Sequence, residues 1–156
     1  MADAIFTART AYDPTHPKAL AVYCSDGRYT DAVEELLHSL GHARLDTLTM
    51  PGGPALLHMR AAAYSDVGAT SRAASFLIRG HGTQQIVLLA HDGCGYYRHR
   101  YPADRAEQVY TRQLDDLRES ARVVARMGSQ LGVLLYYARA EGNRVHFAPV
   151  PAQEKR

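Results

Sequence analysis

Both cysteines of the chain and one of its eight histidines stand where they could together bind a soft metal ion. Cys24 closes one apolar run, His91 closes another, and Cys94 follows His91 after only two residues. Two thiolates and an imidazole favour zinc over magnesium or calcium, with ferrous iron as the weaker competitor. Three protein ligands leave tetrahedral zinc one open position, which distinguishes a catalytic site from a closed structural one. These residues therefore predict a catalytic zinc site.

Each of these side chains also has a simpler interpretation. A lone His-x-x-Cys spacing is a weak signal, because either residue is more often packed in a core than bound to a metal. Cys24 could instead be a nucleophile, since Cys24, Gly27 and Arg28 superficially resemble the anion-binding loops of sulfur-transfer and phosphatase enzymes. That loop is short, however, and it leaves His91 and Cys94 unexplained. The metal site accounts for all three residues at once and is the favoured hypothesis.

Asp26 and Arg28 lie in the loop that directly follows Cys24. A carboxylate at Asp26 can reach a zinc-bound water, while the Arg28 guanidinium keeps that carboxylate ionised and oriented. A general base beside a Lewis acid is typical of hydrolysis or hydration. The alternative is a surface ion pair in a polar turn. Because both residues adjoin the expected metal, we predict that they are catalytic.

Five extended segments are expected along the chain. Continuous apolar runs predict strands at 19–24 and 85–91 that are buried on both faces, and a further strand is expected at 45–50. Two more segments, at 133–138 and 144–150, flank a turn and predict a strand-turn-strand near the end of the chain.

Helices are expected between these strands. Thr30 can cap a helix that ends at Gly41. Two helical stretches are expected at about 55–64 and 71–79, and a long amphipathic helix at about 104–127. Strands and helices that alternate in this way predict an α/β fold, with a mostly parallel central sheet flanked by helices and the strand-turn-strand at its edge.

The totals fit one domain. The chain has 156 residues, is 46% apolar and shows no repeat or linker, so residues 1–156 are predicted to form a single domain. Within it, residues 1–17 are expected to be an N-terminal arm and residues 152–156 a loose tail. Ligand sites of open α/β sheets form at the carboxyl ends of the strands, where Cys24 and His91 stand.

Charge and hydropathy exclude several classes of partner. The formal charge is +2, and the basic residues are spread along the chain, so we expect neither nucleic-acid nor membrane binding. The longest apolar stretch, Ile86–Ala90, is too short to span a bilayer, and the N-terminus does not resemble a signal peptide. We therefore expect a cytoplasmic protein with reduced cysteines and a small-molecule substrate.

The sequence contains two motifs, Cys-x-Asp-x-Arg and His-x-x-Cys-Gly. Their residues are Cys24, Asp26 and Arg28 in the first motif, and His91, Cys94 and Gly95 in the second. In both motifs the sequence resembles the β-class carbonic anhydrases, which carry them at the ends of two core strands. The resemblance continues through the helix and strand at 73–89 and the strand-turn-strand at 136–147, and so covers most of the chain from about Pro17.

The resemblance implies a zinc enzyme that hydrates carbon dioxide reversibly to bicarbonate through a zinc-bound hydroxide. It implies a Zn²⁺ cofactor and a homodimer or higher homo-oligomer. Asp26 would accept the hydrogen bond of the hydroxide and orient it, and Arg28 would secure Asp26. In some members the aspartate moves onto the zinc, so Asp26 is also a candidate for an inhibitory fourth ligand.

The sequence departs from the family pattern around the expected pocket. Thr15 stands where members usually place a substrate-binding glutamine, and the loop Met50–Pro54 keeps only a glycine of the usual segment. Two bulky residues, Tyr96 and Tyr97, follow Gly95 and are expected close to the pocket mouth. These departures leave two alternatives open, a zinc hydrolase acting on another small substrate such as a sulfur analogue of carbon dioxide, or an inactive zinc-binding protein.

Overall fold

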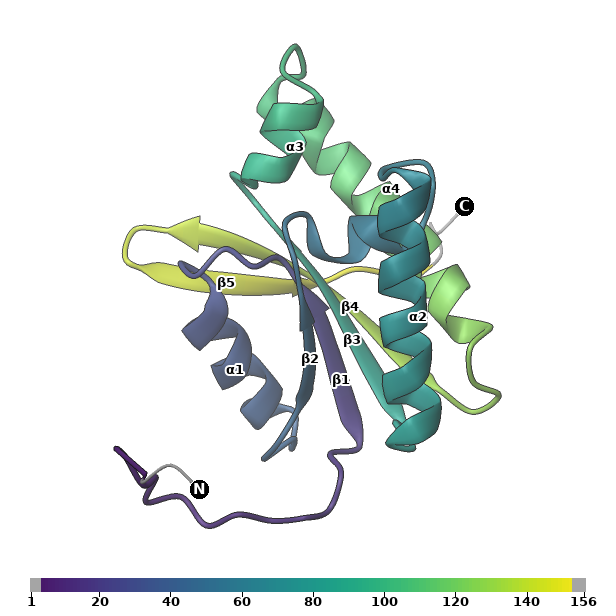
Figure 1. The fold of residues 1–156 in the computed structure, drawn as a ribbon. Coiled ribbons are helices and arrows are strands. Elements are labelled where there is room, and N and C mark those ends of the chain that lie inside the picture. The colour runs from purple at the N-terminus through teal and green to yellow at the C-terminus, as the bar shows by residue number, and fades with distance from the viewer. Residues whose placement is uncertain (1–3, 153–156) are drawn as a thin grey trace.

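In the computed structural model, which describes residues 4–152, the chain forms a five-stranded sheet of order β2-β1-β3-β4-β5 (Figure 1). The strands are β1 (Ala19–Tyr23), β2 (Asp46–Thr49), β3 (Gln85–His91), β4 (Gly132–Glu141) and β5 (Arg144–Pro149). The first four are parallel, and β5 pairs with β4 in the antiparallel sense. The predicted α/β class, with a strand-turn-strand at the sheet edge, is confirmed.

The two central strands are buried on both faces. Every residue of β1 is at most 5% exposed, and Ile86–Leu89 of β3 are at most 2% exposed. Between Gln85 and His91 the side chains of β3 are all apolar, and β1 is apolar apart from the hydroxyl of Tyr23, so helices must cover both faces. The apolar runs in the sequence therefore predicted the right strands for the centre of the sheet.

Helices cover the two faces of the sheet unequally (Figure 1). On one face, α1 (Thr30–Ser39) packs Val33 and Leu37 against alternate residues of β1 and β3. On the other face, α2 (Tyr64–Gly80), α4 (Ala106–Ala125) and the short 3₁₀ helix η1 (Gly53–Leu57) pack on the remaining residues of the same strands. Successive side chains of a strand point to opposite faces, so β1 and β3 contribute to both cores.

The order of the strands changes direction at β1 and β3, which are hydrogen-bonded neighbours in the sheet. The chain leaves β1 through α1 to reach β2 on one side, and it leaves β2 through α2 to reach β3 on the other side of β1. Right-handed crossovers in opposite directions place α1 and α2 on opposite faces, so the loops after β1 and β3 diverge. Open α/β sheets bind ligands at such a reversal point, outside the carboxyl ends of the strands. Cys24 directly follows β1, and His91 is the last residue of β3.

The prediction of two helical stretches at 55–64 and 71–79 is wrong in its boundaries. Helical structure in the first stretch ends with η1, residues 58–63 form turns and bends, and α2 is one continuous helix from Tyr64 to Gly80. Gly68 interrupts the helical sequence signal, but one glycine inside a helix is tolerated at about 1 kcal/mol when the helix packs well.

Two smaller details also differ from the prediction. Thr30 is the first residue of α1 rather than its cap, because Tyr29 takes the capping position through a backbone hydrogen bond to the Asp26 carbonyl. A short helix, α3 (Gly95–Arg100), was not predicted, and it begins directly after Cys94.

The ends of the chain fall partly outside the described residues. These include 1–3 of the predicted arm and 153–156 of the predicted tail. Among residues 4–152, no helix has the length and apolar character needed to cross a membrane.

Candidate metal centre

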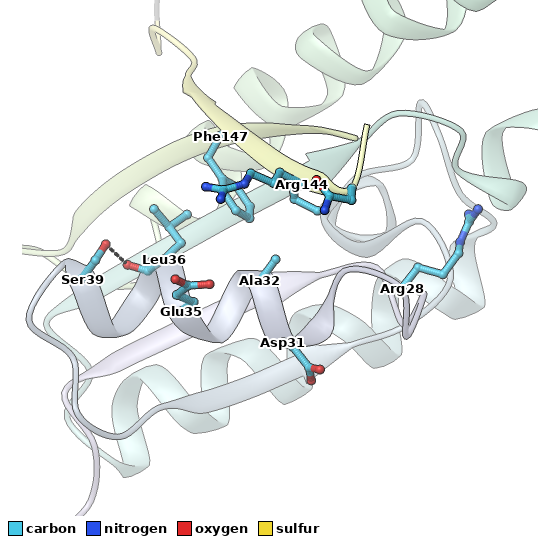
Figure 2. Close-up of a pocket in the computed structure, with 10 residues that line it drawn as sticks. Arg28, Asp31, Ala32, Glu35, Leu36, Ser39, Arg144 and Phe147 are labelled. Carbon is cyan, nitrogen blue, oxygen red and sulfur yellow. Dashed lines mark hydrogen bonds between the residues drawn. The ribbon is translucent and has the colours of Figure 1, made fainter. Parts of the chain in front are cut away.

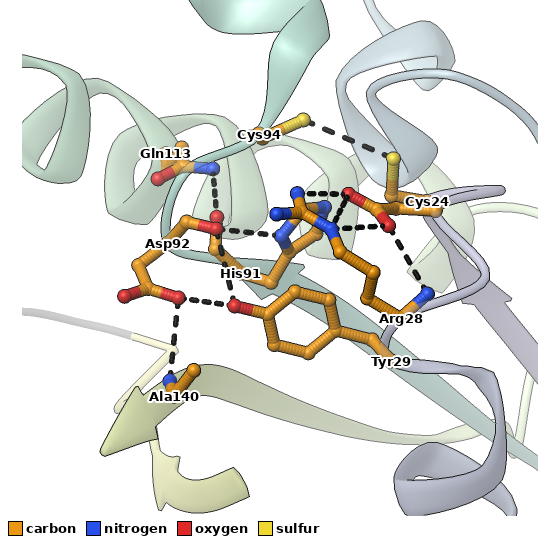
Figure 3. Close-up of polar contacts among 9 residues, drawn as sticks. Cys24, Arg28, Tyr29, His91, Asp92, Cys94, Gln113 and Ala140 are labelled. Atoms are coloured by element: carbon orange, nitrogen blue, oxygen red, sulfur yellow. Dashed lines mark hydrogen bonds and ion pairs between the residues drawn. The ribbon is translucent and has the colours of Figure 1, made fainter. Parts of the chain in front are cut away.

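The carboxyl ends of β1 and β3 bring three potential ligands together (Figure 3). The donor atoms of Cys24, His91 and Cys94 all lie within 4.8 Å of one another, and the two sulfur atoms are 3.8 Å apart. Gly93 has a φ of +61°, which glycine adopts without strain, and it lets the chain turn back so that Cys94 faces His91. The three residues that the sequence singled out therefore share one point in space.

The donor set and its geometry fit a zinc ion. Two thiolates that bind tetrahedral zinc at about 2.3 Å lie about 3.8 Å apart, which matches the observed separation of the sulfurs. The Nδ1 atom of His91 lies 2.7 Å from the Asp92 carbonyl oxygen, so it donates there and leaves Nε2 with a free lone pair. That Nε2 is buried and has no hydrogen-bond partner among the described residues. A bound cation would satisfy it.

The two cysteine side chains are close enough to hydrogen-bond to each other. A hydrogen bond from the Cys94 thiol lowers the pKa of Cys24 to about 4, and His91 acts in the same direction. Backbone N–H groups of Gly52 and Asp26 also face the Cys24 sulfur and favour its thiolate. The pKa of Cys94 is raised by the same bond and by burial. The pair thus holds one negative charge, and a cation between the sulfurs would release the second proton.

Asp26 and Arg28 form the predicted pair beside Cys24. The Arg28 Nε donates to both carboxylate oxygens at 2.9 and 3.2 Å, and one terminal nitrogen donates to Oδ2 at 2.5 Å. These bonds hold the pKa of Asp26 at about 2, so it is ionised at neutral pH. Asp26 is not part of the cluster formed by Cys24, His91 and Cys94. Both of its carboxylate oxygens accept hydrogen bonds from Arg28.

A bond between the two motif loops was missed by the sequence analysis. The Tyr29 hydroxyl donates to the carboxylate of Asp92, which also accepts from the Ala140 backbone N–H at 3.4 Å (Figure 3). The Tyr29 ring lies 4.3 Å from the His91 ring, and burial raises the pKa of the phenol. Tyr29 and Asp92 adjoin the two motifs, which was the available signal, but no periodicity pairs residues so far apart in the chain.

The family model described as “Putative carbonic anhydrase” matches residues 15–147, which is most of the chain. The chain belongs to this family. A comparison with curated proteins gave no significant match.

Solved β-carbonic anhydrases share the fold. The enzyme CafA of the fungus Aspergillus fumigatus is 16% identical, with a TM-score of 0.56, over 90% of this chain and 78% of that one. Isoform I of the protozoan Trichomonas vaginalis is 14% identical, with a TM-score of 0.57, over 88% and 86% of the two chains. A tetrameric β-carbonic anhydrase of the ascomycete Sordaria macrospora is 14% identical, with a TM-score of 0.55, over 85% and 81%. At these identities the likeness shows the fold, and the predicted resemblance is confirmed.

The tyrosines that follow the second motif of this carbonic anhydrase relative do not both stand at a pocket mouth, as the sequence suggested. Tyr97 is only 2% exposed, and its hydroxyl donates to Asp116 Oδ2 at 2.6 Å. The Tyr96 hydroxyl donates to the Ala61 carbonyl oxygen at 2.5 Å. The prediction is wrong for Tyr97, because α3 turns its second tyrosine into the core beneath the sheet edge.

The loop that differs from the family pattern packs directly on the first ligand. Gly53 has a φ of +52°, and a Cβ there would lie 2.7 Å from the Cys24 backbone nitrogen. The Ser25 N–H donates to the Met50 carbonyl oxygen at 3.2 Å. Thr15, in contrast, is exposed and bonds to Asp13 within the arm. The loop therefore supports Cys24, while the hydrogen bonds of Thr15 go to Asp13 and Arg44, away from the three candidate ligands.

Two pockets differ in their relation to the ligands. One, of 690 Å³, lies between α1 and β5 and includes Leu36 and Phe147, with Arg28 at one end (Figure 2). It contains none of the three ligand residues. The other, of 320 Å³, reaches Cys94 and is otherwise lined in part by Val109 and Tyr137. Of the three candidate ligands only Cys94 lines this second pocket, whereas Cys24 and His91 line a much smaller one of about 10 Å³.

Proposed function

We propose that the chain is a zinc enzyme that hydrates carbon dioxide reversibly to bicarbonate. The observation that carries this proposal is the group formed by Cys24, His91 and Cys94, whose donor atoms lie within 4.8 Å, beside an ionised Asp26. Membership of the carbonic anhydrase family supports the same chemistry. The 320 Å³ pocket beside Cys94 has apolar and polar lining residues, as sites for small molecules do.

Asp26 and Arg28 have separate roles in this proposal. When bound, zinc lowers the pKa of a coordinated water toward neutrality and so supplies a nucleophile at physiological pH. Asp26 is ionised, and its fixed carboxylate would accept a hydrogen bond from that water, which orients a lone pair toward the substrate carbon. Arg28 acts through Asp26, because its donors hold the carboxylate in place.

The decisive experiment pairs metal analysis with carbon dioxide hydration by stopped flow. We expect one zinc ion per purified chain and measurable hydration. Cys94→Ser should lose both zinc and activity. Asp26→Ala should keep its zinc and lose about 100-fold in rate, in line with the removal of a general base. Asp31→Ala removes a nearby exposed carboxylate and serves as the matched control, with no change in rate.

Three results would contradict carbon dioxide hydration. A zinc-loaded parent that is inert toward carbon dioxide but hydrolyses a sulfur analogue would assign the alternative substrate, for which the altered Met50–Pro54 loop is the motive. A zinc-loaded parent that is inert toward both would assign a binding or regulatory role. Rapid alkylation of Cys24 in zinc-loaded protein would instead indicate a nucleophilic cysteine.

We also propose that the protein is a homodimer or a higher homo-oligomer. Large apolar side chains are exposed on the arm and on α2, namely Ile5, Phe6 and Phe76. Exposed apolar side chains of this kind favour association when they gather on an interface. Analytical ultracentrifugation of the full chain tests the assembly, and a monomer at micromolar concentration would contradict it.

A further inference from the structure

The helix α4 carries three polar side chains on its buried side. Gln113, Asp116 and Ser120 are spaced by three and four residues, so they line one face of the helix. They are 1%, 8% and 0% exposed, and the core residue Leu117 lies among them. Burial of an amide, a carboxylate and a hydroxyl is unfavourable unless each has a hydrogen-bond partner. Their partners therefore indicate what this polar face does.

Gln113 holds the backbone of a metal-ligand candidate. Its amide nitrogen donates to the His91 carbonyl oxygen at 2.7 Å (Figure 3). Its amide oxygen accepts from the Tyr137 hydroxyl at 3.1 Å, and Tyr137 lies on β4, the neighbour of β3. Both ends of the Gln113 amide are thus fixed, so α4 sets the position of the His91 backbone.

Asp116 holds the helix that begins at the other end of the same turn. It accepts from the Tyr97 hydroxyl at 2.6 Å, and the His58 imidazole lies 3.5 Å from its second oxygen. Tyr97 lies in the first turn of α3, which starts after Cys94, and the Arg98 N–H donates to the Cys94 carbonyl oxygen at 3.2 Å. Tyr97 packs with Cys94 in one buried cluster, so it links Asp116 to the turn that carries Cys94.

Ser120 completes the pattern on the first ligand. Its hydroxyl donates to the Pro54 carbonyl oxygen at 2.6 Å. Pro54 follows Gly53, whose backbone packs against the backbone of Cys24. All three polar side chains of the α4 face thus bond to segments that carry or touch a ligand.

We propose that Gln113 and Asp116 are positioning residues for the metal centre, which hold His91 and Cys94 at the separation that zinc requires. The inference rests on the proposed zinc site but not on the substrate. Apolar residues of similar size would fill these positions without the need for partners, so core packing alone does not explain an amide and a carboxylate here. Residues behind metal ligands commonly alter metal affinity by about 10- to 100-fold when mutated.

The test compares metal binding at matched stability. Gln113→Met and Asp116→Leu keep the side-chain size and remove the hydrogen bonds of these residues. Tyr97→Phe removes only the hydroxyl that donates to Asp116. Asp116→Asn retains an acceptor for that hydroxyl and serves as the rescue variant. Leu117→Val, on the same buried helix face, removes core volume, leaves the hydrogen bonds of Gln113 and Asp116 in place and is the control.

The readouts are zinc affinity by chelator competition and the visible absorption spectrum of the cobalt-substituted protein. Gln113→Met, Asp116→Leu and Tyr97→Phe should each weaken zinc by about tenfold or more and shift the cobalt bands. Asp116→Asn and Leu117→Val should stay within about twofold of the parent. Variants that unfold more easily but match the parent in affinity and spectrum overturn the inference alone. A parent with no thiolate–cobalt band overturns the zinc site and this inference together.

Discussion

The two chain segments that carry the proposed ligands are held in different ways. The loop after β1 positions Cys24 through backbone packing against Gly53 and an ion pair between Asp26 and Arg28 at the surface, where the Arg28 side chain is 69% exposed. The turn after β3 is held by buried side chains, including Gln113 from α4 and Tyr29 from the opposite loop.

The difference teaches where each ligand is sensitive to change. Close packing between backbones is disrupted by added side-chain atoms and not by the loss of a polar group. The Cys24 loop should therefore tolerate the loss of polar groups but not the introduction of larger residues. A buried hydrogen bond is costly when one partner is removed, because the other stays desolvated. The turn after β3 should therefore be intolerant of polar deletions.

Gly53→Ala should produce the largest effect of the substitutions that probe this comparison. The added Cβ would meet backbone atoms of Tyr23 and Cys24 at 2.7 Å, in a residue with a φ of +52°. We expect a loss of about 3 kcal/mol in unfolding free energy, from backbone strain plus overlap. Gly142→Ala is the control, since its φ is +61° and a Cβ there meets nothing within 4 Å. It should lose only about 1 kcal/mol in urea unfolding.

Tyr29→Phe should have the next largest effect. It removes the hydroxyl that donates a hydrogen bond to the Asp92 carboxylate. A hydrogen bond to a charged group contributes about 2 kcal/mol. Urea unfolding measures the loss. Tyr64→Phe changes an exposed tyrosine and should stay within about 0.5 kcal/mol of the parent. Equal effects of the two substitutions would show that the Tyr29 bond does not hold the turn.

His58, which lies beside Asp116 under α3, should also make the stability of the protein sensitive to acid. Burial lowers the pKa of His58 below 6.5, and the charge of Arg60 acts in the same direction. The charges of Asp116 and Glu119 raise it but do not outweigh burial. As the pH drops below 6.5, His58 is protonated in the unfolded chain before it is protonated in the folded protein. Stability therefore falls as the pH drops below 6.5. This contribution has a slope of at most about 1.4 kcal/mol per pH unit.

His58→Leu removes that contribution. Unfolding free energies of the parent and the variant, measured from pH 7.5 to 5, should show the parent losing stability relative to the variant as the pH falls. A constant difference across this range would mean that His58 does not supply the acid sensitivity. Burial raises the pKa of Asp116, so its own contribution has the opposite sign, with stability rising as the pH falls toward 3.8.

Arg28→Gln should have the smallest effect on stability. The arginine is largely exposed, and exposed ion pairs contribute little to folding because water screens them. The urea midpoint should match that of the parent within experimental error. A shift as large as that of Tyr29→Phe would mean that the Cys24 loop depends on its polar pair, and the proposed contrast between the two segments would fail.

Much of the fold and the cluster of Cys24, His91 and Cys94 could be predicted from the sequence, because the signals involved are local. The apolar runs of β1 and β3 leave no polar face for water, so they had to lie at the sheet centre. Cys24 and His91 stand at the ends of those runs, which fixed the edge where a ligand site forms. The boundaries of η1 and α2 were wrong, because the glycine at position 68 weakens a helix locally while tertiary packing sustains it.

The sequence by itself determined the chemistry of this protein, namely which residue types could bind a soft cation and which strand ends carry them. Only the tertiary structure decided the geometry. The Cys24 and Cys94 sulfurs are 70 residues apart in the chain and 3.8 Å apart in space because the strand order places β3 beside β1. The tertiary structure also decided the place of Tyr97, which lies in the core rather than at a pocket mouth, where its hydroxyl donates to Asp116. Side-chain chemistry is a property of each residue, whereas proximity depends on how every element packs.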